Sequence, residues 1–234
     1  MRRAAAVLAL ALATAAPAGA EGIAAARFTD PTTRYDHAVL GDAVEYGALE
    51  MRTETGRRIT VTLPETRVFE DLAPRLVDLD GDGASEVLVI ETDIARGARL
   101  SVYGADGLIA ANDFIGRRNR WLAPLGAADL DGDGQVEIAY IDRPHLAKTL
   151  VILRRAGDRL VEVARHAGLT NHRIGDDWIS GGIARCDDGR MVMLLADADW
   201  RRARAVTWDG ARFAIRDRGL IRGRDDLSPR RACG

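Results

Sequence analysis

The sequence predicts an all-β fold, a β-propeller of about four four-stranded blades that follows a cleaved signal peptide. An acidic segment that starts at residue 78 recurs 51 residues later, at residue 129, and each copy leads into apolar runs separated by glycine-rich turns. A repeat period of roughly 40 to 50 residues is typical of propeller arrays. Beyond the first 20 residues, no helical periodicity of about 10 or more residues occurs. These observations favour stacked β-units over helices.

The first 20 residues have the pattern of a secretory leader. A basic start precedes the apolar run 4–16, and an Ala-Gly-Ala cleavage site ends at Ala20. We expect residues 1–20 to be a signal peptide and residues 21–234 to form one mature domain that is periplasmic or secreted. The apolar run is too short to span a bilayer and no longer one follows, so no stable membrane anchor is expected.

The charge balance limits the class of partner. The chain has 33 basic and 35 acidic residues, and the predicted leader removes two arginines and no acid. A slightly acidic mature protein does not suit a general binder of nucleic acid or anionic membrane, so we expect no nucleic-acid partner.

The repeat extends beyond the acidic segment. DLDGDGASEVLVIE (78–91) aligns with DLDGDGQVEIAYID (129–142), and each is followed by a predicted hairpin, over 98–116 and 148–168. Weaker copies precede and follow these two. The predicted units are 36–74, 75–125, 126–178 and 179–218. The remaining stretch 22–35 is expected to add a strand to the last unit and close a ring.

The acidic segment has the spacing of a calcium loop. Asp at places 1, 3 and 5 turns alternate carboxylates inward, and Gly at place 6 permits the sharp turn. Place 12 is Val89 or Tyr140 and the flanks are strands, so this is not an EF-hand; the last carboxylate comes at place 9 instead. The predicted ligands are Asp78, Asp80, Asp82, the Ala84 carbonyl and Glu86 in the first site, and Asp129, Asp131, Asp133, the Gln135 carbonyl and Glu137 in the second.

Hard oxygen donors in this number suit Ca²⁺ better than Mg²⁺ or Zn²⁺, so two structural calcium sites are predicted. The alternative is that Asp and Gly are simply good turn formers, which explains one Asp-Gly pair but not two complete loops. In the fourth unit the corresponding positions are Ala184, Cys186 and Asp188, and no third site is expected there.

These loops resemble the FG-GAP/VCBS repeats, best known from the propellers of integrin α-subunits. Phe114-Ile115-Gly116 and Leu122-Ala123-Pro124 resemble the Phe-Gly and Gly-Ala-Pro elements of that repeat. Glu stands where the family has Asp at the ninth loop place, and an insertion splits Phe-Gly. The resemblance implies a calcium-bearing propeller with a binding or assembly role. Integrin propellers have seven blades and this chain has residues for about four, so a propeller completed by another chain stays open as an alternative.

Two cysteines, Cys186 and Cys233, lie in a chain predicted to enter an oxidising compartment. A disulfide between them is the expected state, and two free thiols are the alternative.

Three arginine- and tryptophan-rich loops are candidate ligand sites, because these residue types dominate binding hot spots and tryptophan can stack on a sugar. The alternative is that the tryptophans pack between blades. The candidates are Arg120, Trp121, Trp178 and Trp200.

No catalytic motif is present, and the four histidines, His37, His145, His166 and His172, are scattered through the sequence. The expected function is therefore a non-enzymatic protein-interaction module with an unidentified protein or glycan partner. The alternatives are a carbohydrate-binding, lectin-like propeller and, third, a hydrolase.

Overall fold

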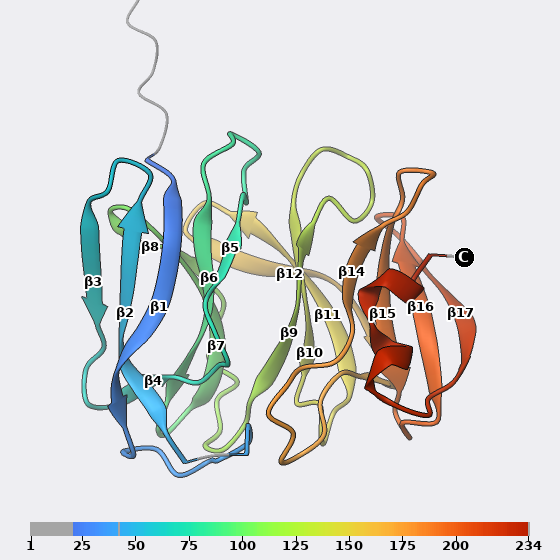
Figure 1. Cartoon of the computed structure of the whole chain (residues 1–234), viewed down its shortest axis with the longest axis horizontal. Coiled ribbons are helices and arrows are strands. Elements are labelled where there is room, and N and C mark those ends of the chain that lie inside the picture. The colour runs from blue at the N-terminus through green and yellow to red at the C-terminus, as the bar shows by residue number, and fades with distance from the viewer. Residues whose placement is uncertain (1–20, 42, 234) are drawn as a thin grey trace, which may run out of the picture.

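The computed structural model describes residues 21–41 and 43–233, which form seventeen β-strands and two short 3-10 helices. The predicted signal peptide lies outside the described residues. Within this part of the chain, no helix has the length and apolar character required to cross a membrane. The all-β prediction is confirmed (Figure 1).

The strands form four antiparallel groups in chain order. Group 1 contains β1 (Ile23–Thr32), β2 (Glu45–Thr53) and β3 (Arg58–Thr62); group 2 contains β5 (Arg75–Val77), β6 (Glu86–Asp93), β7 (Gly97–Gly104) and β8 (Gly107–Ala111); group 3 contains β9 (Leu122–Ala128), β10 (Glu137–Asp142), β11 (Thr149–Ala156) and β12 (Arg159–Ala167); group 4 contains β14 (Gly182–Arg185), β15 (Met191–Asp197), β16 (Arg202–Trp208) and β17 (Phe213–Leu220).

Short elements connect and complete the groups. β4 (Arg67–Phe69) pairs with both β2 and β6, and β13 (Leu169–Thr170) pairs with β15. β8 and β12 meet through a single parallel pair, Ala111 with Arg159, so groups 1 to 3 form one curled sheet. Group 4 forms a second sheet, and the helices η1 (Arg224–Leu227) and η2 (Pro229–Arg231) follow it.

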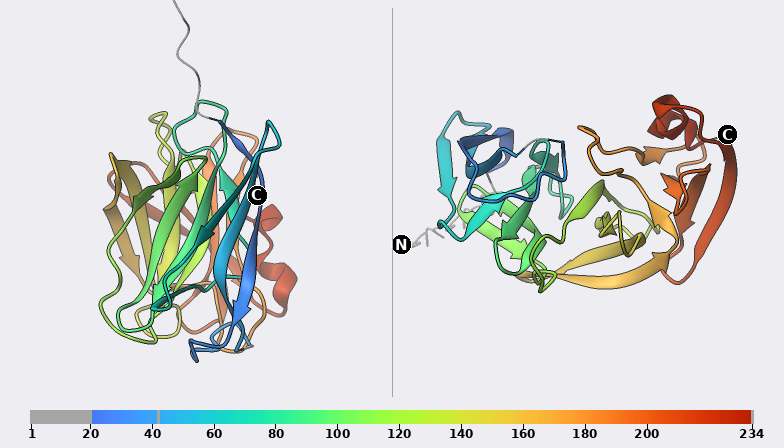
Figure 2. Two further views of the ribbon diagram at one scale, coloured as in Figure 1. Left: turned by 90° about the vertical axis from the view of Figure 1, so that its left-hand side faces the viewer. Right: turned by 90° about the horizontal axis from the view of Figure 1, so that it is seen from below.

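The groups follow one another along an arc. Seen from below, the N-terminal group and the C-terminal group lie at opposite ends of this arc (Figure 2). Successive meanders packed face to face around a curve are the arrangement of propeller blades. The fold is therefore propeller-like.

The N-terminal strand corrects one prediction. β1 was expected to join the last unit, but it pairs antiparallel with β2, from Ile23 opposite Thr53 to Thr32 opposite Glu45. This pairing is the local one, between strands that follow each other in the chain, and sequential strands usually lie together. Group 1 therefore begins at Ile23, and the segment 22–35 does not close a ring.

The core consists of apolar layers between neighbouring groups, because the central strands are buried on both faces. On β6, Val87 and Val89 pack toward group 1, whereas Leu88 and Ile90 pack toward group 3. β10 and β15 divide their side chains between two layers in the same way. Alternation of side chains along a strand produces this division, and burial on both faces explains the unbroken apolar runs in the sequence.

The outward face of group 4 is also covered. Leu227 and Ala232 of the C-terminal segment are 2% and 4% exposed, and they pack with Val192 and Leu194 of β15. The red helices lie against this face at the right of Figure 1. Without this segment, the apolar residues of the last sheet would face water.

Candidate functional site

The first acidic loop connects β5 and β6 and is organised by its own backbone. Both carboxylate oxygens of Asp78 accept amide hydrogen bonds, from Gly81 at 2.8 Å and from Gly83 at 3.1 Å. Both glycines have positive φ, 76° and 87°, which favours glycine at these turns. Asp82 accepts the Ala84 amide at 2.8 Å. The loop therefore holds its carboxylates in a compact turn.

This arrangement suits a hard cation. Oxygens of Asp78, Asp80 and Asp82 lie within 4.8 Å of one another. Glu86, at the start of β6, is 4% exposed, and its Oε2 accepts the Leu79 amide at 2.9 Å. Burial raises the pKa of Glu86, and the three aspartates raise it further. Like charges crowded around a buried carboxyl would be relieved by a bound cation. The donor set consists of oxygens alone, as Ca²⁺ prefers.

The second loop, between β9 and β10, repeats this geometry. Asp129 accepts the amides of Gly132 at 2.7 Å and Gly134 at 3.1 Å, and Glu137 accepts the Leu130 amide at 2.9 Å. The converging carboxylates here belong to Asp129, Asp131 and Glu137. The two loops thus share one backbone design (both at the upper end of Figure 1).

The two loops differ in one respect. Arg154 of β11 reaches into the second loop, where its Nε donates to Glu137 Oε1 at 2.7 Å and its Nη2 lies 3.1 Å from Asp131 and from Asp133. Burial raises the pKa of Glu137, and Arg154 opposes that rise. No guanidinium of the described residues reaches Glu86. The converging oxygens of the first loop could hold a cation, whereas Asp131 and Glu137 of the second loop already face the guanidinium of Arg154.

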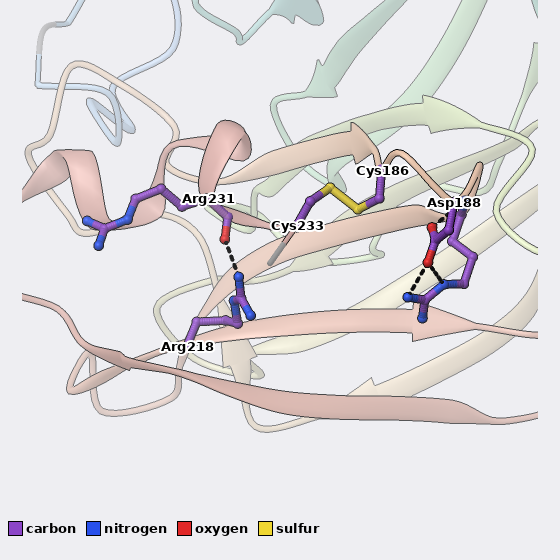
Figure 3. The surroundings of a disulfide bond; sticks show 6 residues. Cys186, Asp188, Arg218, Arg231 and Cys233 are labelled. Atoms are coloured by element: carbon purple, nitrogen blue, oxygen red, sulfur yellow. Dashed lines mark hydrogen bonds and ion pairs between the residues drawn. A yellow bond between two sulfur atoms is a disulfide. The ribbon is translucent and has the colours of Figure 1, made fainter.

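The corresponding loop of group 4 is a simple turn. Gly189 donates its amide to the Cys186 carbonyl at 2.8 Å, and the Asp188 carboxylate is paired with Arg190 at 2.7 Å. Cys186 is joined to Cys233 by a disulfide with the Cα atoms 5.4 Å apart, as predicted (Figure 3). Arg218 donates to the Arg231 carbonyl at 3.1 Å beside it. This loop has become an attachment point for the C-terminal segment.

The predicted tryptophan sites occupy two neighbouring hollows. Trp121 is 2% exposed and donates its Nε1–H to the Glu70 carbonyl at 2.8 Å, although it still borders a pocket with Arg120. Trp178 and Trp200 line a second hollow together, and each has a guanidinium over its ring, Arg224 at 4.7 Å and Arg173 at 4.4 Å.

Sequence reasoning missed a histidine cluster. His37, His145 and His172 are far apart in the sequence, yet they come together at the opposite end of the strands from the acidic loops. His145 Nε2 lies 2.9 Å from His172 Nδ1, and His37 Nδ1 lies 2.6 Å from Glu70, which is fully buried. No spacing rule connects these positions. The fold joins them because the segments 33–41, 143–148 and 171–181 all lie at the lower end of Figure 1.

The hydrogen-bond directions in this cluster follow from one acceptor. His172 Nε2 lies 3.0 Å from the Asp176 carbonyl, so it must donate, which leaves His172 Nδ1 as an acceptor for the His145 Nε2–H. Burial lowers the pKa of His145 to about 4, and His172 contributes to this decrease. The pair is therefore neutral at physiological pH and holds the loop 171–178 against group 3.

Comparison with known families supports the repeat. Residues 78–140 match the family model described as FG-GAP-like repeat. The matched segment contains both acidic loops and confirms the resemblance to the FG-GAP-like repeat family. The protein is thus a β-propeller-like module that carries an FG-GAP-like repeat. No curated protein and no solved structure matches the chain.

Proposed function

We propose that this chain is an exported, calcium-stabilised β-propeller of four blades that acts as a non-enzymatic protein-interaction module. One observation carries the interaction role. The two most exposed large apolar side chains among the described residues, Leu146 at 63% and Ile174 at 73%, line the same pocket. Exposed apolar groups gathered at one place mark contact surfaces.

The pocket also suggests the chemistry of the partner. Its lining includes Arg120, Arg143 and Trp121 and contains no acidic residue. Arginine and tryptophan beside exposed aliphatic groups are the composition of binding hot spots. A protein segment that combines an apolar side chain with nearby carboxylates would complement this surface.

Calcium is assigned a structural role. The acidic loops lie at the upper end of the strands in Figure 1, whereas the connections that carry His37, His145 and Ile174 of the pocket lie at the lower end, so an ion in the loops would stabilise the strand connections without touching a partner. Saturation at 100 times the dissociation constant would add roughly 2.7 kcal/mol of stability. The disulfide supports export, because such bonds persist in oxidising compartments.

The second candidate is glycan binding. The hollow shared by Trp178 and Trp200 also contains Asp176 and three arginines, a mixture that can bind a sugar by stacking and hydrogen bonds. The guanidiniums over both rings compete with such stacking. A glycan array distinguishes the candidates: binding lost in Trp178→Ala would favour the lectin-like function.

The interaction role is tested by a paired substitution. In capture from the envelope of the exporting cell, the double variant Leu146→Ser/Ile174→Ser should lose a partner that the native protein retains. The matched control is Leu108→Ser/Leu220→Ser, because these side chains are 50% and 54% exposed and do not line the pocket. Equal recovery of the same proteins by both variants would contradict the proposal.

A further inference from the structure

Two loops with the same DLDGDG sequence face different residues across their sheets. In group 3 the strand register places Arg154 directly opposite Glu137. In group 2 the register places Tyr103 opposite Val87, so the neighbour of Tyr103, Gly104, takes the position across from Glu86. The second loop thus receives a long cationic side chain at a position where the first loop has none.

The guanidinium of Arg154 lies among the carboxylates of the second loop. It is within 3.1 Å of Asp131, Asp133 and Glu137, and the Glu137 side chain is fully buried. On its other side the Arg154 Cζ lies 5.9 Å from the centre of the Trp208 ring in group 4. Charge-assisted hydrogen bonds of this kind are among the strong ones, and an arginine keeps its charge at any ordinary pH.

The next residue provides a contrast within the same strand. Successive side chains on a strand point to opposite faces, and Arg155 accordingly extends toward the first loop. It approaches only the outer carboxylate of Asp80, at 3.5 Å, and that side chain is 46% exposed. Arg155 therefore borders the first loop, whereas Arg154 fills the second.

We propose that Arg154 is the resident cation of the second loop, so that the chain has one tight calcium site, in the first loop, instead of two. This inference depends on the calcium part of the proposed function. A calcium ion in the second loop would have to displace the guanidinium from three carboxylates, or share the cage with a like charge. Calcium binding there should be at least tenfold weaker than at the first loop.

The test counts bound calcium by equilibrium dialysis and isothermal titration of the mature protein. The native protein should bind one tight ion, Arg154→Met should bind two, and the control Arg155→Met should still bind one. Terbium provides a second signal, because an ion in the second loop lies near Trp208 and should be sensitised by it only in Arg154→Met.

A second pair of variants keeps Arg154 in place, in case Arg154→Met does not fold. Asp80→Asn should abolish tight binding, whereas Asp133→Asn should leave one tight ion. Two ions of similar affinity in the native protein would overturn the inference while leaving the calcium role intact. No calcium bound by either the native protein or Arg154→Met would overturn both.

Discussion

The disulfide closes the C-terminal end of the array, and its contribution can be calculated from its position. Cys186 and Cys233 are 47 residues apart in sequence. In the chain-entropy model, a cross-link over a loop of this length restricts the unfolded chain by roughly 4 kcal/mol. The bond also holds the segment with Leu227 over the apolar face of β15. Loss of the bond should therefore destabilise the protein and loosen this segment together.

The perturbation is the double variant Cys186→Ser/Cys233→Ser, compared with the native protein in urea and followed by tryptophan fluorescence. Trp200 belongs to the apolar layer under the C-terminal segment and reports on it. With a urea dependence of about 2 to 3 kcal/mol per molar, the unfolding midpoint should fall by roughly 1 to 2 M. Reduction of the native protein should give the same shift.

The control separates the covalent bond from the packing beneath it. Leu227→Ala leaves the disulfide intact but removes a side chain that is 2% exposed, which should cost about 2 to 4 kcal/mol. If the double serine variant unfolds at the same urea concentration as the native protein, the cross-link does not stabilise the fold by restricting the unfolded chain. If only Leu227→Ala were less stable than the native protein, the stability of the C-terminal end would come from packing and not from the disulfide.

Further predictions concern the loops and the histidine pair. Asp80→Asn should abolish the calcium-dependent increase in melting temperature, roughly 5 to 10 °C, whereas the calcium response of Asp188→Asn should equal that of the native protein in differential scanning fluorimetry. In Gly181→Ala the free energy of unfolding, measured in urea, should fall by roughly 2 to 4 kcal/mol, because φ is 81° and a Cβ would overlap the Leu194 carbonyl. In Gly175→Ala, where φ is 87° but the space is open, it should fall by only about 1 kcal/mol. The pKa of His145 falls from 6.5 to about 4 on folding, so the unfolded state binds protons better. The free energy of unfolding should therefore decrease by roughly 2 kcal/mol as the pH falls from 6.5 to about 4. In urea titrations of His145→Gln, the free energy of unfolding should depend less on pH.

Much of the fold was predictable because the determining signals are local. The runs VLVI (87–90) and IAYI (138–141) are apolar at consecutive positions, as expected of strands buried on both faces, and each follows a loop whose glycines permit the turn. The disulfide was predictable from the number of cysteines and the expected oxidising compartment. The converging aspartates of the first loop follow from their alternate spacing.

The remaining features depend on register, which a single sequence specifies weakly. The sequence of β1, IAAARFTDPT, has no pattern that selects β2 over a distant strand as its partner. Arg154 is 17 residues beyond Glu137, and only the β10–β11 register brings the two together. A signal was nevertheless present: aligning the two hairpins by their apolar residues places Arg154 on Gly104, so the repeats differ at this position.

The two end faces explain how an open array can persist in water. Repeat arrays need terminal units whose outer faces are polar or covered, since each inner unit buries its faces against neighbours. In group 1, Leu49 and Met51 of β2 point toward group 2, and the alternate residue Glu50 points outward to Arg27 at 2.9 Å. In group 4 the disulfide-bound C-terminal segment covers the face that a further blade would occupy. One end is therefore polar by sequence and the other is covered by the chain itself, as a terminal unit of a repeat array requires.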